Sequence, residues 1–131
     1  RAIAEILDLR RYVTFKSNIS REELLQEYSR ARVFVLASDY ESYGIAAVEA
    51  IAMGIPTVVS NGSALVEFAE CNAAIGLDPP ITGVKVAEAI LLAENFKPRD
   101  ARERIMSWDE VASRLECIYT NLLEESNVLM S

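Results

Sequence analysis

The chain has 131 residues, of which 51% are hydrophobic and 25% charged, and its formal net charge is -7. This length fits one domain or part of one, and the apolar share is enough to fill a core. The acidic balance argues against nucleic acid or an anionic membrane as the main partner. The chain has no histidine, which excludes Ser-His-Asp, Cys-His and His-metal chemistry.

Location can be inferred from the two cysteines and from the absence of targeting patterns. Cys71 and Cys117 form no metal-binding or redox motif, so we expect inert, half-buried thiols in a reducing, cytoplasmic compartment. No apolar run approaches the roughly 20 residues of a membrane span, and no signal-peptide pattern appears. Basic spots leave peripheral membrane contact by the full-length protein as an alternative; they comprise Arg10, Arg11, Arg99, Arg102 and Arg104.

The first third of the chain predicts a helix, a strand and a second helix. The chain begins with Arg1 inside an apolar helical pattern, so we expect a fragment whose natural N-terminus lies elsewhere. Tyr12–Phe15 predicts a short strand. Ser20 and Glu23 form a capping box that starts the next helix. Its apolar face has helical spacing and comprises Leu24, Leu25, Tyr28 and Ala31.

The middle of the chain alternates between strands and helices. Val33–Leu36 is a continuous apolar run, typical of a central strand that is buried on both faces. Gly44 opens a helix that ends at Gly54, shortly before Pro56. Thr57–Ser60 predicts the next strand.

The last part continues the alternation and ends in helices. We expect a helix over about 64–70, a weak strand at 74–77, a helix at 82–94, a short helix near 99–104, and a long helix over about 107–125. Ser107 and Glu110 form a second capping box at the start of the long helix. The order predicts an α/β, Rossmann-like parallel sheet with helices on both faces, followed by a long C-terminal helix.

The segment from Glu41 to Glu49 is the strongest functional signal. Two carboxylates, with seven residues between them, flank the glycine at the start of a helix. The first N–H groups of a helix lack intrahelical partners and carry a partial positive charge, which suits an anionic ligand. The acids themselves cannot bind phosphate and are better suited to the hydroxyl groups beside it. The pattern therefore indicates a nucleotide sugar.

From about Tyr12 to Leu123 the chain resembles the C-terminal domain of group 1 (family 4) retaining glycosyltransferases, which have the GT-B fold. The resemblance rests on segments in the family's order: the helix and strand over 24–36, the Glu-x7-Glu signature with its glycine over 38–50, the Gly-x-Pro strand over 52–60, and Trp108 near the last helix. It implies sugar transfer from a nucleotide-diphosphate sugar with retention of configuration, without a cofactor and usually without a metal.

Carried onto this chain, the resemblance assigns roles to six residues. Glu41 would contact the donor sugar as the catalytic carboxylate, and Glu49 would accept hydrogen bonds from the ribose hydroxyls. The diphosphate would contact backbone N–H groups of Ser42, Tyr43, Gly44 and Ile45. The chemistry is reasonable, because a carboxylate can accept from two vicinal hydroxyls and a glycine lets a ligand approach the backbone.

For each of these residues a purely structural role is the alternative to ligand binding. Glu49 could be a solvated residue of an amphipathic helix, and Glu41 a loop carboxylate stabilised only by the helix dipole. Tyr43 could pack rather than bind. Gly62–Ser63 resembles a second helix entrance at the same sheet edge, although capping alone explains it. Trp108 favours a core anchor for the last helix over a sugar platform.

The chain departs from the family at its start. The family's first strand and glycine-rich loop, with an Arg and a Lys for the diphosphate, have no match; Arg11 and Lys16 have a similar spacing, but an offset of five puts them on opposite strand faces. Residues 1–131 would then be a single incomplete domain, without two strands and without the acceptor-binding domain. We expect it to be inactive alone. The strand at 12–15 would pair with Val33–Leu36 or find the missing strands in another chain.

The leading interpretation is the donor-binding portion of a retaining glycosyltransferase with an unknown acceptor. A non-catalytic nucleotide-sugar-binding or regulatory module and a sugar-nucleotide epimerase of GT-B shape remain alternatives. A nucleotide-binding oxidoreductase is disfavoured, because the chain has no Gly-x-Gly-x-x-Gly. Contacts to the base are expected in the loop over 16–19. Expected partners are the donor sugar nucleotide and the acceptor, with self-association as an alternative.

Overall fold

A computed structural model describes residues 2–97 and 105–129. Contacts within the chain divide it into two units, Arg1–Ala31 and Arg32–Ser131, and each is described by itself. The first unit holds α1 (Ala2–Ile6) and α2 (Arg21–Arg30). The second unit holds the sheet and the remaining helices.

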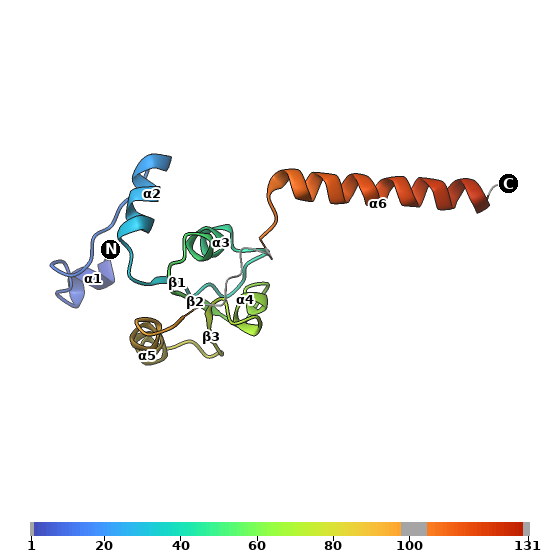
Figure 1. The fold of residues 1–131 in the computed structure, drawn as a ribbon. Coiled ribbons are helices and arrows are strands. Elements are labelled where there is room, and N and C mark those ends of the chain that lie inside the picture. Colours follow the sequence, from blue (N-terminus) through green and yellow to red (C-terminus); the bar gives the residue numbers. More distant parts are fainter. Residues whose placement is uncertain (1, 98–104, 130–131) are drawn as a thin grey trace. The chain divides into compact units, whose positions relative to one another are not determined.

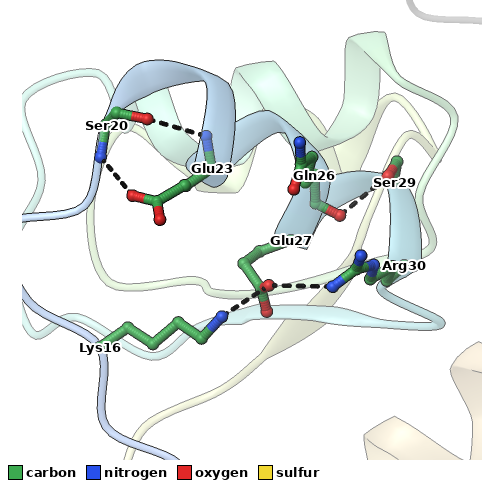
Figure 2. Close-up of polar contacts among 7 residues, drawn as sticks. All are labelled: Lys16, Ser20, Glu23, Gln26, Glu27, Ser29 and Arg30. Carbon is green, nitrogen blue, oxygen red and sulfur yellow. Dashed lines mark hydrogen bonds and ion pairs between the residues drawn. The ribbon is translucent and has the colours of Figure 1, made fainter.

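The predicted capping box at the start of α2 is confirmed. The Ser20 hydroxyl accepts from the Glu23 N–H at 3.2 Å, and the Glu23 carboxylate accepts from the Ser20 N–H at 2.9 Å (Figure 2). In the same unit, one carboxylate oxygen of Glu27 lies 2.8 Å from the Lys16 ammonium and 3.7 Å from the Arg30 guanidinium. The hydrogen bond and positive charge of Lys16 lower the pKa of Glu27 from its ordinary value of 4.5. These contacts tie the segment before α2 to the helix.

The predicted strand at Tyr12–Phe15 is wrong. The Tyr12 N–H donates to the Leu9 carbonyl at 2.9 Å, and the Val13 N–H donates to the same oxygen at 3.1 Å. Both bonds continue the turn that follows α1, and no strand is assigned over residues 12–19. A strand needs neighbours for its backbone groups, and the sheet of the described residues consists of three other strands. Pairing of this segment with another chain stays a prediction.

The second unit is built on a parallel sheet, as predicted. Its strands are β1 (Phe34–Leu36), β2 (Thr57–Ser60) and β3 (Ile75–Leu77), in the order β1-β2-β3 (Figure 1). Val58 of β2 lies opposite Val35 on one side and Ile75 on the other. All three strands therefore end at the same edge of the sheet.

Alternating side chains of the strands feed two separate cores. On one face, Val59 packs with residues of α3 (Ile45–Ala52) and α4 (Val66–Glu70). On the other face, Val58 and Leu77 pack with α5 (Gly83–Ala93). Helices thus cover both faces of the sheet, which confirms the predicted α/β class.

The prediction that Val33–Leu36 is a central strand, buried on both faces, is partly wrong. β1 was expected to be central and buried, but in the described sheet it lies at the edge and its three residues are only half-buried. The fully buried strand is β2, from Thr57 to Ser60. An edge strand has a neighbour on one side only, so the helices of this unit cannot cover it as fully as they cover β2.

The C-terminal helix α6 (Trp108–Leu129) runs a little further than expected. Its capping box is confirmed, because the Glu110 carboxylate accepts from the Ser107 N–H at 2.6 Å and the Ser107 hydroxyl accepts from the Glu110 N–H at 3.3 Å. Trp108 is 84% exposed, so its predicted role as a core anchor is wrong. Other large apolar residues of α6, among them Ile118 and Tyr119, are exposed too. The short helix expected at 99–104 lies outside the described residues.

Two further predictions concern cysteines and membranes. Cys71 is half-buried, as expected, whereas Cys117 on α6 is exposed; both thiols are free. Within the described residues, every helix is too short or too polar to cross a membrane.

Candidate functional site

The candidate site lies where the three parallel strands end. In open α/β sheets, ligands bind outside the carboxyl ends of the strands. At this edge the segments after β1, β2 and β3 surround a hollow of about 280 Å³. Its lining residues are Ser38, Asp39, Ser60, Gly62, Pro79, Pro80 and Ile81.

Glu41 lies in the loop between β1 and α3, and its hydrogen-bond partner Ser38 lines the hollow. The Glu41 side chain is half-buried, and its Oε1 atom accepts a hydrogen bond from the Ser38 hydroxyl at 2.9 Å. Ser38 is fixed in turn, because the hydroxyl of Ser60 donates to the Ser38 carbonyl. Ser60 ends the central strand and is 1% exposed. Two hydrogen bonds therefore connect the carboxylate to the interior of the sheet.

Gly44 stands at the start of α3 in a conformation that favours glycine. Its φ is 77° and its ψ 53°, in the left-handed region. A Cβ atom at this position would overlap the side chain of Leu65, which is fully buried. Because Gly44 has no side chain, it cannot cap α3 as Ser20 caps α2. An external anion can take the place of that cap.

The three other residues predicted around Gly44 are exposed. Ser42, Tyr43 and Ile45 lie on either side of the glycine, and 61% of Ile45 is accessible. The Tyr43 ring also contacts the Phe68 ring edge-to-face, with centroids 6.4 Å apart. Tyr43 thus packs against Phe68, which is one of the two roles considered for it, and about half of its side chain stays exposed.

Glu49 lies in the middle of α3. It is half-buried, while its neighbours Val48 and Ala50 are buried. Glu41 and Gly44 are thus brought together at the carboxyl end of β1, and Glu49 lies further along the helix that Gly44 opens. Their roles toward a donor stay predictions.

The expected second helix entrance at Gly62–Ser63 has a different form. α4 begins at Val66, its N-cap is Leu65, and no side chain caps it. The Ser63 hydroxyl is buried and has no hydrogen-bond partner among the described residues. The structural alternative for Gly62–Ser63, in which Ser63 caps the following helix, is therefore wrong.

Sequence reasoning did not identify Ser38 and Ser60. The spacing of Ser38 three residues before Glu41 was a signal, because side chains of serine often bond across such short turns. The contact of Ser60 with Ser38 joins residues 22 apart in the chain. It follows from the strand pairing and could not be read from local pattern.

No group of three or more Cys, Asp or Glu side chains suited to a metal ion occurs in the part of the chain that the structure describes. The pair Asn61 and Asp78 joins the ends of β2 and β3, with the Asn61 amide donating to the Asp78 carboxylate at 2.8 Å. The Asn61 side chain lies against Gly76, where a Cβ would overlap it. This contact secures the sheet edge that bears the site.

Comparison with known proteins identifies the family of the chain. Residues 1–105 match the family model described as glycosyl transferases group 1. An uncharacterized glycosyltransferase of Methanocaldococcus jannaschii is 31% identical over 131 residues, covering 90% of this chain and 33% of the relative. Glycogen synthase of Mycobacterium tuberculosis is 34% identical over 119 residues, covering 83% of this chain and 28% of the relative.

A solved structure agrees in fold. The chain matches sucrose-phosphate synthase from Thermosynechococcus elongatus with a TM-score of 0.75 and 29% identity, over 95% of this chain and 33% of that one. The chain thus spans a third or less of the length of these relatives. The likeness supports the expected Rossmann-like architecture of GT-B type. Because the family model covers most of the chain, the chain belongs to the group 1 glycosyl transferases.

Proposed function

We propose that this chain is the donor-binding portion of a retaining glycosyltransferase that takes a sugar from a nucleotide-diphosphate sugar. The observation that carries the proposal is the opening of α3, where the N-cap residue Gly44 is in the left-handed region and has no side chain with which to cap the helix. Beside it, Ser38 holds a half-buried carboxylate, that of Glu41. Membership of the group 1 family agrees with this chemistry.

Each part of the arrangement has a chemical task in the proposed reaction. The N-terminal end of α3 stabilises charge that develops on the departing diphosphate, which is where preorganised dipoles are most effective. Glu41 accepts hydrogen bonds from hydroxyls of the donor sugar, and Glu49 from those of the ribose. The acceptor attacks on the face that the leaving group departs from, and a phosphate oxygen serves as base. Neither histidine nor a metal ion is required.

The chain by itself should not transfer sugar. Residues that match the family's diphosphate-binding Arg and Lys are missing, and an acceptor is not held, so neither charge neutralisation nor orientation is complete. Nucleoside diphosphate release from UDP-glucose, GDP-mannose and ADP-glucose measures this. Turnover by the purified 131-residue chain would contradict the proposal that sugar transfer needs residues outside this chain.

Binding to the donor site is tested by calorimetric titration with uridine, guanosine and adenosine diphosphates. The protein for this and the following activity tests is the longest polypeptide that contains these 131 residues. We expect Glu49→Ala to weaken the preferred diphosphate by about tenfold or more, since a charged hydrogen bond contributes about 1.5–3 kcal/mol. Glu41→Ala should leave diphosphate affinity nearly unchanged but reduce turnover of the nucleotide sugar, because the diphosphate carries no donor sugar.

The matched control is Glu88→Ala, which removes an exposed carboxylate from α5. It should change neither affinity nor turnover. Full affinity and full turnover after both Glu41→Ala and Glu49→Ala would overturn the assignment. Product analysis by chromatography separates transfer from epimerisation, because transfer joins the sugar to an acceptor, whereas epimerisation changes the configuration of the sugar.

A further inference from the structure

We infer that Ser38 is a positioning residue for Glu41 and that Ser60 anchors it to the sheet. The inference rests on the proposed function, in which Glu41 meets the donor sugar. It adds two residues that the Glu-x7-Glu signature does not include. Neither serine needs to touch the reacting atoms.

The first link orients the carboxylate. The Ser38 hydroxyl has one proton to donate, and it donates this hydrogen bond to Oε1 of Glu41 at 2.9 Å. A hydrogen bond from a hydroxyl to a carboxylate is of the charge-assisted, stronger kind. Because one oxygen is held, rotation of the carboxylate is restricted and Oε2 keeps a fixed direction. That oxygen is then available to accept from a sugar hydroxyl.

The second link fixes Ser38 itself. The Ser60 hydroxyl donates to the Ser38 carbonyl across two chain segments that are 22 residues apart. Ser60 is 1% exposed and belongs to β2, all four residues of which are buried. The loop that carries Glu41 is thereby attached to β2, the most buried strand of the described sheet. Asp39 and Tyr40, which separate Ser38 from Glu41, are exposed and offer no such anchor.

Both serines also line the hollow at the carboxyl edge of the sheet. Ser38 therefore contacts the candidate catalytic carboxylate and also lines the hollow. A residue that only closed a turn would not need a buried partner on another strand. The connection from Ser60 through Ser38 to Glu41 is what a supporting shell around a functional carboxylate requires.

The test removes the Ser38 hydroxyl and separates chemistry from binding. In the longest polypeptide that contains this chain, Ser38→Ala should lower kcat for nucleoside diphosphate release from the active nucleotide sugar by roughly 10- to 100-fold, the effect of a misplaced reacting group. The dissociation constant of the nucleoside diphosphate, measured by calorimetry, should stay unchanged. Ser38→Thr restores the hydroxyl and should restore much of kcat.

Controls distinguish positioning from a general loss of structure. Ser29→Ala removes a serine hydroxyl that also bonds in a turn, to the Gln26 carbonyl on α2, and should leave kcat unchanged. If Ser38→Ala does not fold, Ser38→Cys takes its place, because the thiol keeps the size of the side chain but donates weakly. It should show the same loss of kcat.

A double-mutant cycle gives the decisive readout. In a Glu41→Ala background, Ser38→Ala should cause no further loss of kcat, since the group that it positions is absent. An equal fold-loss in both backgrounds would overturn the positioning role, as would an unchanged kcat of Ser38→Ala while Glu41→Ala is impaired. If Glu41→Ala itself keeps full kcat, the proposed function fails, and that result is distinct from a failure of Ser38 alone.

Discussion

The helices α3 and α5 pack against the same central strand but begin in different ways. α5 starts after Thr82, whose backbone is extended and whose hydroxyl accepts from the Lys85 N–H at 3.3 Å. α3 starts after Gly44, which is left-handed and carries no side chain. α2 and α6 follow the pattern of α5, each with a serine capping box.

Among the described helices of eight residues or more, α3 differs from the others in that its N-cap residue provides no side-chain hydrogen bond. A glycine N-cap costs only a few tenths of a kcal/mol relative to serine. The opening of α3 therefore remains stable without a side chain at its N-cap, and under the proposed function the diphosphate binds there. Under the proposed function, the start of α5 serves stability and the start of α3 serves binding.

The largest expected effect comes from Gly44→Ala. The new Cβ would overlap the buried Leu65 side chain, and overpacking costs about 1–3 kcal/mol. The left-handed backbone adds roughly 1–2 kcal/mol for a non-glycine residue. We expect a lower free energy of unfolding, measured in urea, together with at least a tenfold loss of nucleoside diphosphate affinity.

Gly54→Ala is the matched control for that change. Gly54 has nearly the same φ, 75°, but nothing lies within 4 Å of the added Cβ, and it follows the end of α3. It should lose roughly 1–2 kcal/mol of stability through backbone strain alone, with diphosphate affinity intact. Equal losses of affinity in the two variants would remove the distinction between the start and the end of α3.

Removal of the α5 cap should be smaller and should affect stability only. Thr82→Ala deletes the acceptor for the Lys85 N–H, and loss of a cap typically costs about 1 kcal/mol. Urea unfolding measures the loss, and calorimetry with the nucleoside diphosphate should show no change. Weakened diphosphate binding in Thr82→Ala would mean that the two helix starts do not differ in function.

The smallest effect concerns pH and the capped start of α6. Hydrogen bonds from the backbone and hydroxyl of Ser107 lower the pKa of Glu110 from its ordinary value of 4.5. Its contribution to stability is thus fully present above that value and is lost as pH falls through the lower pKa of the folded state. Circular dichroism should show a slightly weaker acid dependence of helicity below pH 4.5 for Glu110→Gln. An unchanged acid dependence would contradict the capping role.

Local features of this fold were predictable from sequence, and features that depend on neighbours were not. The boxes at Ser20 and Ser107, the glycine at position 44 and the strand at 57–60 each follow from residues close together in the chain. The segment 12–15 has the composition of a strand, but a strand also needs partners. Trp108 is apolar, yet it is exposed, because burial of a helix's apolar side chains depends on what packs against the helix.

The candidate site was predictable to the same extent. Glu41, Gly44 and Glu49 stand in one continuous motif, so their proximity to the start of α3 could be anticipated. The hydrogen bond from Ser60 to Ser38 joins residues brought together only by the pairing of β1 with β2. The Leu65 side chain leaves no room for a Cβ atom at position 44, and this likewise depends on how Leu65 packs in the core with α3.

The central claim is that a diphosphate binds at the start of α3. Titration of the ¹⁵N-labelled protein with the nucleoside diphosphate that binds most tightly, followed by amide chemical shifts, tests it most directly. The account predicts large shifts for the amides of Gly44 and Ile45 and none for those of Gly83 and Val84 at the start of α5. Saturated binding that leaves Gly44 and Ile45 unshifted would contradict it.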